Sequence, residues 1–389
     1  MKLVYITNAR IPTEKAHGLQ IMKMCEAFAS LRIPVELVVP RRVNTIKQGP
    51  FEYYGVKRIF KIKKVFCVDL FWLRILPARI SFHIQSFSFS VLVLVRALLK
   101  YQRKSDIFYS RDYITLLSLC FFSFWPVAEI HDYRSEKPRW FMRFILSRAR
   151  KIIVNSEGTK EFLLEHYPSV SKKLLVAPNG VDVKFFDIKE LREEARERLN
   201  IPKEQTIIGY VGRLETIGKE KGASFLLRAF GMLSESRKDC MLYIIGGPGE
   251  LIEKYKASFE KWGISSGKIV FAGQVEYVKI PLYLKAIDVV VIPSPMESKY
   301  AATTSPIKLF EFLAAGKVIA AADTPSFRNY LNENNALFFR SGDHKDLSDK
   351  LNYLTENKNL AEKISQQAFC DAKNYSWLSR AEKIIEFIK

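Results

Sequence analysis

The chain has 389 residues, 48% of them hydrophobic and 13% aromatic, and a formal net charge of +20. This length exceeds what one hydrophobic core usually supports, so we expect two domains, and the apolar content excludes a disordered chain. The five cysteines, Cys25, Cys67, Cys120, Cys240 and Cys370, are scattered. That spacing argues against a disulfide framework or a zinc site and favours a reducing, cytoplasmic compartment.

The basic residues are concentrated in the first half of the chain. Residues 1–188 contain 31 Lys and Arg against 15 Asp and Glu, whereas the rest of the chain is nearly balanced. A basic half fits a polyanionic partner, which could be nucleic acid, an anionic membrane surface or a phosphorylated substrate. Charge alone leaves these three classes open.

The N-terminal residues predict a strand over Lys2–Thr7, a loop to Gly18 and then an amphipathic helix. Strand, loop and helix in this order are the usual opening of a doubly wound sheet. No charged-then-apolar leader precedes the strand, so we expect no secretion signal. The loop lacks the GxGxxG pattern of dinucleotide-binding proteins, and Gly18 is either a point of ligand approach or a plain turn glycine.

A second strand is expected over Pro34–Pro40, and a basic, aromatic segment follows it. Residues 41–104 contain 14 Lys and Arg but only two acids, Glu52 and Asp69. Within it, Ile80–Leu99 is nearly long enough to span a bilayer, but its polar residues favour a soluble helix with one broad apolar face. Two interpretations stay open: a surface seated on a membrane interface, or an ordinary packed helix beside a charged loop.

Further core strands are expected over Asp106–Ser110, Val127–Ile130 and Lys151–Asn155, with a buried helix over Ile114–Trp125. Ligands gather at the carboxyl ends of parallel strands. His131 follows one of these strands directly, so it is a candidate functional residue, with Arg111 and Asp112 weaker ones. The strand and Pro-Asn-Gly turn of Lys173–Asp182 close the first half.

The second half repeats the pattern of strand, loop and helix. A strand over Thr206–Val211 leads to Arg213, and Lys221 precedes a helix that starts at Ala223. A forked guanidinium and a lysine in a loop before a helix suit phosphate oxygens. Two more strands, within Met241–Gly249 and Lys268–Val275, end in glycine-bearing turns.

The stretch Thr303–Asp323 predicts a helix with Ser305 as its N-cap and Pro306 at its first position, ended by Gly316. A short buried strand, Val318–Ala322, follows. The start of such a helix suits an anion. Glu311 is a carboxylate on an otherwise apolar helix, and the simplest interpretation is a solvated side chain paired with Lys308.

Four segments of this sequence, EIHD, GYVGRL with KEKG, DVVVIPS and SPIKLFEFLAAG, resemble the signatures of glycosyltransferase family 4, whose members are retaining enzymes. The resemblance implies an α/β GT-B fold, in which two doubly wound Rossmann-like domains face each other across a cleft. It implies an acceptor-binding domain over 1–182, a nucleotide-sugar-binding domain over 183–370, and a C-terminal helix over 371–389 that crosses back to the first domain.

The resemblance also implies roles for individual residues. His131 would hydrogen-bond the transferred sugar, Arg213 and Lys221 would grip the donor diphosphate, and Glu311 would hold the ribose hydroxyls. The family commonly has a second glutamate where this chain has Thr303, which we interpret as a changed sugar contact. The remaining donor-binding candidates are Gly18, Gly246, Val275, Ser305, Ile307 and Lys308.

The expected function is therefore transfer of a sugar from a nucleotide-sugar donor to a glycan or lipid-linked acceptor in cell-envelope polysaccharide synthesis. No DxD motif occurs, so a metal-bridged diphosphate is not indicated and we expect no metal. We also expect no cofactor, with the nucleotide-diphosphate sugar as a substrate. We expect the enzyme in the cytoplasm, peripheral on the inner face of the membrane. The alternatives are a nucleotide-sugar epimerase of the same fold and a basic nucleic-acid-binding protein, although no nucleic-acid-binding signature is found and no nucleic-acid partner is expected.

Overall fold

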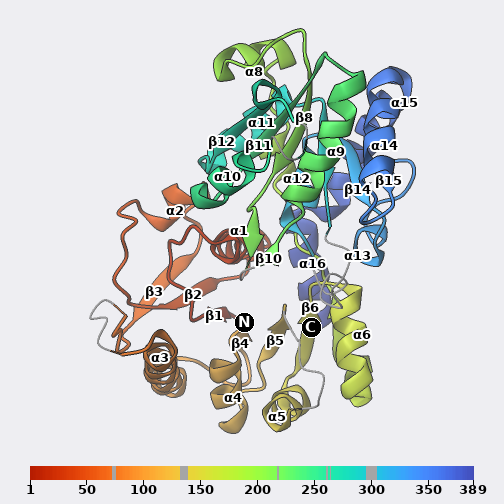
Figure 1. The fold of residues 1–389 in the computed structure, drawn as a ribbon. Coiled ribbons are helices and arrows are strands. Elements are labelled where there is room, and N and C mark those ends of the chain that lie inside the picture. The colour runs from red at the N-terminus through yellow and green to blue at the C-terminus, as the bar shows by residue number, and fades with distance from the viewer. Residues whose placement is uncertain (72–75, 132–138, 217–218, 260–261, 263, 295–304) are drawn as a thin grey trace. The chain divides into compact units, whose positions relative to one another are not determined.

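The computed structural model describes residues 1–71, 76–131, 139–216, 219–259, 262, 264–294 and 305–389. The chain forms two compact units, and neither is a single continuous segment. Unit 1 comprises Met1–Gly180, Ser305 and Trp377–Lys389, and unit 2 comprises the described residues of Val181–Ala302 together with Pro306–Ser376. Each unit is an α/β fold built on one parallel sheet (Figure 1).

The sheet of unit 1 has seven strands in the order β3-β2-β1-β4-β5-β6-β7, and every neighbouring pair is parallel. The central strands are short apolar runs that the sequence predicts, because a strand covered on both faces is apolar throughout. The bounds are β1 Leu3–Ile6, β2 Val35–Pro40, β3 Lys61–Val65, β4 Ile107–Ser110, β5 Val127–Ile130, β6 Lys151–Val154 and β7 Leu174–Val176.

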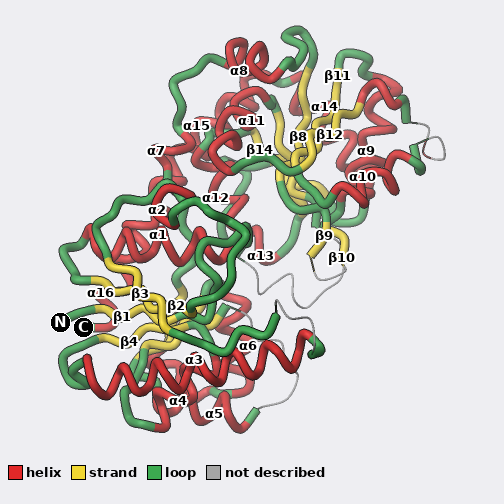
Figure 2. The backbone as a smooth tube through the Cα atoms, turned by 90° about the vertical axis from the view of Figure 1, so that its left-hand side faces the viewer, coloured by secondary structure: helices red, strands yellow, loops and turns green. Residues whose placement is uncertain are grey.

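Helices cover both faces of this sheet. Helices α3, α4 and α5 lie side by side on one face, and α1 lies with the C-terminal helix α16 on the other (Figures 1 and 2). The bounds are α1 Ala16–Ser30, α2 Pro50–Tyr53, α3 Ala78–Lys100, α4 Tyr113–Phe121, α5 Trp140–Arg148, α6 Glu157–His166 and α16 Trp377–Ile388. Thus the last helix of the chain packs on the first.

Unit 2 has a six-stranded parallel sheet in the order β12-β11-β8-β13-β14-β15. In Figure 2, α9 and α10 lie on one side of its strands, and α8, α11 and α12 lie on the other. A small antiparallel hairpin pairs β9 Glu215–Thr216 with β10 Lys219–Glu220. The strands of the main sheet are β8 Thr206–Val211, β11 Cys240–Ile245, β12 Ile269–Gly273, β13 Val289–Ile292, β14 Val318–Ala322 and β15 Leu337–Phe339.

The helices of unit 2 bury a single large core against this sheet. Gly316 has a positive φ of 57°, which ends α12 as the sequence predicts. The bounds are α7 Val183–Phe186, α8 Arg192–Leu199, α9 Ala223–Ser236, α10 Gly249–Lys256, α11 Ile280–Ala286, α12 Ile307–Ala314, α13 Pro325–Arg328, α14 His344–Glu356 and α15 Lys358–Ala372.

Helix α3 confirms the expected helix, and it both packs Phe89, Val93 and Ala97 into an apolar core cluster and leaves other apolar side chains uncovered. Its buried side chains include Ser81, Gln85, Ser86 and Ser90, whereas Phe87 is exposed together with most of the other large apolar side chains. Among the described residues, α3 is the one helix that is long and apolar enough to cross a membrane by length and composition, and a buried helix can pass the same test.

Candidate functional site

The predicted donor residues of unit 2 follow the strands that meet at one edge of its sheet. Because these strands are parallel, their carboxyl ends share that edge. Arg213 follows β8, Gly246 follows β11 and Val275 follows β12, while α12 comes after β13. The strand order reverses between β8 and β13, and such a reversal is where open parallel sheets bind ligands.

The turns after β8 and β11 are in close contact. The Gly212 amide donates to the Ile245 carbonyl at 2.9 Å. A Cβ on Gly246 would lie 1.7 Å from the Gly212 oxygen, and Gly246 has a φ of +153°, so only glycine fits there. This packing holds the backbone of the loop that carries Arg213, whose carbonyl accepts a hydrogen bond from the Tyr210 hydroxyl at 2.7 Å. The Arg213 side chain itself is exposed.

Lys221 is held at the start of α9. Its amide donates to the Leu214 carbonyl at 2.9 Å, and the next residue, Gly222, has a φ of +87°. Surrounding protein and then the charge of Arg213 lower the pKa of Lys221. Like charges disfavour each other's ionised form, and the Lys221–Leu214 hydrogen bond places the Lys221 backbone beside the residue that follows Arg213. The structure therefore brings the backbone segments that carry these two residues together, and their role as phosphate ligands stays a prediction.

Glu311 is buried, with 1% of its side chain exposed, so the expectation of a solvated glutamate is wrong. The expected pairing is confirmed, because Lys308 Nζ lies 2.7 Å from Glu311 Oε2. That oxygen nevertheless makes no hydrogen bond of good geometry. Burial and then the Glu311 carboxylate raise the pKa of Tyr277. Tyr277 stacks on Phe185 with ring centroids 5.2 Å apart, so an aromatic wall lies beside the carboxylate.

The start of α12 differs from the prediction. The helix begins at Ile307 with Pro306 as its N-cap residue, and no side chain caps it. The Ser305 hydroxyl is used elsewhere, because it accepts a hydrogen bond from the Asn179 amide at 3.0 Å. The Asn179 side chain also donates to the Ser305 carbonyl at 2.6 Å, which fixes this residue within unit 1. Thr303 lies outside the described residues.

In unit 1, a buried carboxylate lies directly behind His131. Glu129 of β5 has 0% exposure, and its oxygens accept from the Tyr5 hydroxyl at 3.0 Å, from Gln20 at 3.0 Å and from Arg380 at 2.6 Å. Burial opposes its ionisation, but Arg380 and then His131 lower the pKa of Glu129 well below its usual value. Glu129 is thus a buried anion that accepts hydrogen bonds from side chains of β1, α1 and α16.

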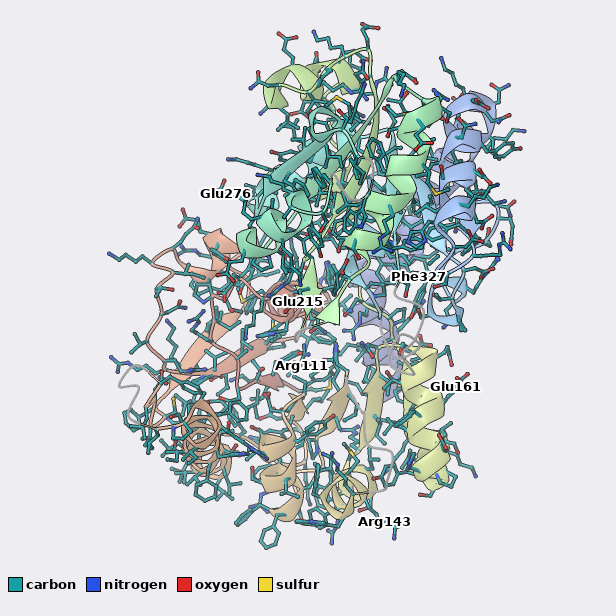
Figure 3. The ribbon with its side chains drawn as sticks, viewed as in Figure 1. Arg111, Arg143, Glu161, Glu215, Glu276 and Phe327 are labelled. Atoms are coloured by element: carbon teal, nitrogen blue, oxygen red, sulfur yellow. The ribbon has the colours of Figure 1, made fainter. Side chains whose placement is uncertain are left out.

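This anion determines which nitrogen of His131 carries the proton. His131 Nε2 lies 2.7 Å from Glu129 Oε1, and a carboxylate only accepts. Burial and then the charge of Arg111 lower the pKa of His131 to about 4. The ring is therefore neutral at pH 7, with its proton on Nε2 and an acceptor lone pair on Nδ1. Arg111, at the end of β4 (Figure 3), donates to Gln20.

Gly18 lies in the first turn of α1, where the protein fills the space beside it. A Cβ at Gly18 would lie 2.1 Å from the Tyr54 hydroxyl and 2.6 Å from Thr13 Cγ2. The Tyr54 hydroxyl in turn donates to the Thr13 carbonyl at 2.7 Å. The glycine is thus required by internal packing, and a ligand contact at this position stays a prediction.

Sequence reasoning missed the residues that hold the candidate groups in place. Glu129 and Arg380 are 251 positions apart, so no local pattern indicates their pairing. A glutamate inside the apolar run VAEI was the available signal, since a buried carboxylate needs a partner. Among the described residues, no group of three or more His, Cys, Asp and Glu side chains could hold a metal ion.

Two family models match consecutive parts of the chain. Residues 18–185 match the one described as Glycosyltransferase Family 4, and residues 191–369 match the one described as Glycosyl transferases group 1. Together they cover both units. The chain belongs to glycosyltransferase family 4. This confirms the resemblance drawn from the four motifs, two of which, EIHD and SPIKLFEFLAAG, contain His131 and Glu311.

Curated relatives of this family 4 chain match part of its length. A lipopolysaccharide 1,2-N-acetylglucosaminetransferase of Salmonella typhimurium is 26% identical over 254 residues, which are 61% of this chain and 62% of the relative. A D-inositol 3-phosphate glycosyltransferase of Corynebacterium jeikeium is 27% identical over 249 residues, 62% of this chain and 57% of the relative. The chain thus spans about three fifths of the length of these relatives.

Solved structures match the family 4 chain over nearly its whole length. A glycosyltransferase from Rickettsia africae superposes with a TM-score of 0.76 at 16% identity and covers 100% of this chain and 98% of that one. Anabaena HepE in complex with UDP gives a TM-score of 0.72 at 15% identity, covering 99% of both chains. At these identities the likeness establishes the GT-B type of fold, with its two parallel α/β sheets.

Proposed function

We propose that this family 4 protein is a retaining glycosyltransferase that moves a sugar from a nucleotide-sugar donor to a glycan or lipid-linked acceptor. One observation carries the proposal. In unit 2, Arg213 and Lys221 follow β8 and Glu311 follows β13, and these two strands flank the reversal in strand order. Two cations and a buried carboxylate at that position suit a diphosphate joined to a ribose.

The relatives support this substrate class. The name of the Salmonella relative assigns it to lipopolysaccharide, and that of the Corynebacterium relative assigns it to D-inositol 3-phosphate. The Anabaena protein was solved with UDP and with UDP-glucose. By extension, we propose a nucleotide-diphosphate sugar as donor here, and an acceptor of the cell envelope.

Each donor contact follows from the chemistry of the side chain. The Arg213 guanidinium can donate to two phosphate oxygens at once, and Lys221 adds a point charge beside it. The charge of Arg213 contributes to the lowered pKa of Lys221, so the two cations repel, and a bound diphosphate would relieve that repulsion. The ribose hydroxyls would take the place of the Lys308 ammonium at Glu311 Oε2, which makes no hydrogen bond of good geometry.

The proposed chemistry uses protein cations to stabilise the departing diphosphate, without a metal. The acceptor hydroxyl attacks the anomeric carbon from the face that the nucleotide leaves, so the anomeric configuration is retained. The leaving phosphate takes the proton of that hydroxyl. His131 would accept a hydrogen bond from a sugar hydroxyl through Nδ1, because Nε2 is already committed to Glu129. We propose that the enzyme works in the cytoplasm, peripheral on the inner face of the membrane.

The experiment is thermal-shift screening against UDP-, GDP-, ADP- and CMP-sugars, followed by transfer assays on variants. A donor that binds the folded protein should raise the melting temperature as its concentration increases. Arg213→Ala and Glu311→Ala should each lower transfer about a hundredfold or more while the protein stays folded. Lys256→Ala, a surface change on α10, is the matched control. Near-normal turnover in both site variants would refute the assignment.

Two further measurements test the finer parts of the proposal. Transfer should persist in excess EDTA, and the anomeric proton of the product should show the configuration of the donor. A requirement for a divalent cation, or an inverted product, would overturn that part alone. Incubating the donor without any acceptor would reveal an epimerase by the appearance of a second sugar.

A further inference from the structure

Helix α3 presents a stripe of apolar side chains on its exposed side. Ile80, Phe87, Val91, Val95 and Leu98 recur every three to seven positions, and each is between 41% and 67% exposed. This spacing places them along one stripe of the helix. Leu99, beside the stripe, is 77% exposed. A surface helix of a globular protein normally turns such a stripe toward its core.

The opposite side of α3 packs on unit 1 through both apolar contacts and hydrogen bonds, since Phe89, Val93 and Ala97 lie in an apolar core cluster. Gln85 donates to the Asn8 side chain at 2.7 Å, and the Asn8 amide group donates to the Ser86 hydroxyl at 2.7 Å. Ser90 lies 3.3 Å from the Thr115 hydroxyl of α4. Rotating the helix to bury its apolar stripe would break these buried hydrogen bonds, so the outward orientation is specified by the chain.

The neighbouring helices continue this apolar surface. Helix α3 contacts α4, and α4 contacts α5, on the same face of the sheet (Figures 1 and 2). Phe121, at the end of α4, is 72% exposed, and Trp140, at the start of α5, is 77% exposed. We call this surface the α3–α5 face and define it by Phe87, Val91, Val95, Leu99, Phe121 and Trp140.

The charge on and around the α3–α5 face is positive. Over residues 76–131 and 139–150, the acids are Asp106, Asp112 and Glu129, and none is exposed. Asp106 accepts from backbone amides, as does Asp112, and Glu129 is buried. The same ranges hold exposed basic side chains, among them Arg79, Lys100, Arg103, Lys104, Arg143 and Arg148. Figure 3 labels Arg143 on α5.

We propose that the α3–α5 face seats unit 1 on an anionic lipid bilayer, with the apolar stripe of α3 lying in the interface and the basic side chains contacting lipid phosphates. This inference names the surface by which the protein would reach the peripheral membrane location proposed above. It rests on the proposed function only for the reason that the protein would be at a membrane, which is to reach its acceptor. Aromatic and aliphatic side chains framed by Lys and Arg are what an anionic interface binds.

Two other occupants fit the structure less well. A second copy of this chain would bring two cationic surfaces together, and their repulsion opposes such a dimer. A membrane-spanning α3 would have to leave unit 1 and carry Gln85, Ser86 and Ser90 into lipid without their present partners. An interfacial seat keeps every one of these hydrogen bonds and still covers the apolar stripe.

The test is co-sedimentation of the full chain with vesicles of phosphatidylglycerol and phosphatidylcholine, against vesicles of phosphatidylcholine alone. We expect binding to the anionic vesicles that weakens in high salt. Phe87→Ser/Leu99→Ser should lower the partition coefficient about tenfold or more, because two exposed apolar side chains leave the interface. The matched control, Leu191→Ser/Val278→Ser, removes two similarly exposed apolar side chains of unit 2 and should bind as the unchanged protein does.

Each outcome decides for or against the inference. Unchanged partition of Phe87→Ser/Leu99→Ser would overturn it. So would a concentration-dependent dimer that this variant abolishes, or protein that alkaline carbonate fails to release from membranes. Both variants change exposed positions, and equal melting temperatures would show that folding is intact. Nucleotide-sugar binding, measured without vesicles, separates the two proposals, since its loss refutes the proposed function and leaves vesicle binding unaffected.

Discussion

Replacing Arg380 by methionine removes the cation that neutralises Glu129, a fully buried carboxylate of unit 1. Arg380 is 4% exposed and Glu129 is 0% exposed, and their nearest atoms are 2.6 Å apart. Leaving one member of such a pair without its partner costs about 3–5 kcal/mol. Because Glu129 keeps Tyr5, Gln20 and His131 as donors, we expect a cost near the lower value, about 3 kcal/mol.

A double-mutant cycle separates the free energy of the Arg380–Glu129 interaction from the free energy lost when side-chain packing is removed. Glu129→Gln alone leaves the Arg380 guanidinium buried, although it still donates to the carbonyls of Ala177 and Pro178. Arg380→Met/Glu129→Gln removes both charges and should cost less than the two single changes added together, with a coupling of about 2 kcal/mol. The free energy of unfolding of unit 1 is read from hydrogen-exchange protection of the β1 and β5 amides.

The same variants shift the pKa of His131 in opposite directions. Glu129 raises that pKa and Arg380 lowers it, so Glu129→Gln should move it lower and Arg380→Met should move it higher. The chain has only five histidines, so NMR titration of labelled imidazoles can resolve His131. Single-variant costs that add within about 0.5 kcal/mol, together with an unmoved His131 pKa, would refute the argument that Arg380 acts through Glu129.

Two further predictions concern the folded state. Gly246→Ala should destabilise unit 2 by several kcal/mol, because the added Cβ would lie 1.7 Å from the Gly212 oxygen. Gly249→Ala should leave stability nearly unchanged, because no atom lies within 4 Å of its Cβ position, and urea unfolding of both variants measures the difference. Burial and then Arg111 lower the pKa of both His17 and His131 to about 4 from the usual value of 6.5, so on acidification the unfolded state binds protons first. Stability should therefore fall as the pH drops from about 6.5 to 4, and His17→Gln/His131→Gln should flatten the dependence of melting temperature on pH in that window. An unchanged slope in the variant would contradict this reasoning.

Much of the fold could be predicted because short apolar runs between turn residues identify strands of a parallel sheet. The strands at Val35–Pro40, Thr206–Val211 and Val318–Ala322 lie where the sequence places them. The strand β3, Lys61–Val65, was missed, because it pairs with β2 alone and its lysines show no apolar run. Periodicity also left the orientation of α3 undecided, since apolar residues occur on all its sides and the polar partners that fix it, such as Asn8, lie far away in sequence.

The candidate site was only partly predictable for the same reason. Motifs made Arg213, Lys221 and Glu311 candidates because their neighbours in sequence form one loop and one helix. The supports of His131 come from β1, α1, β5 and α16, and no local pattern connects four elements. Ser305 is a case where a local pattern gave the wrong prediction. The sequence predicts it as the N-cap of α12, but its hydroxyl accepts a hydrogen bond from Asn179, 126 positions earlier.

Arg380 belongs to unit 1 although it lies in the last thirteen residues of the sequence, after the whole of unit 2. A chimera that exchanges this unit with that of a relative could be made with one cut, near residue 180. Such a cut would separate Glu129 from its guanidinium and α1 from the helix packed on it. A functional chimera must therefore exchange the N-terminal half and the C-terminal helix together, because both belong to unit 1.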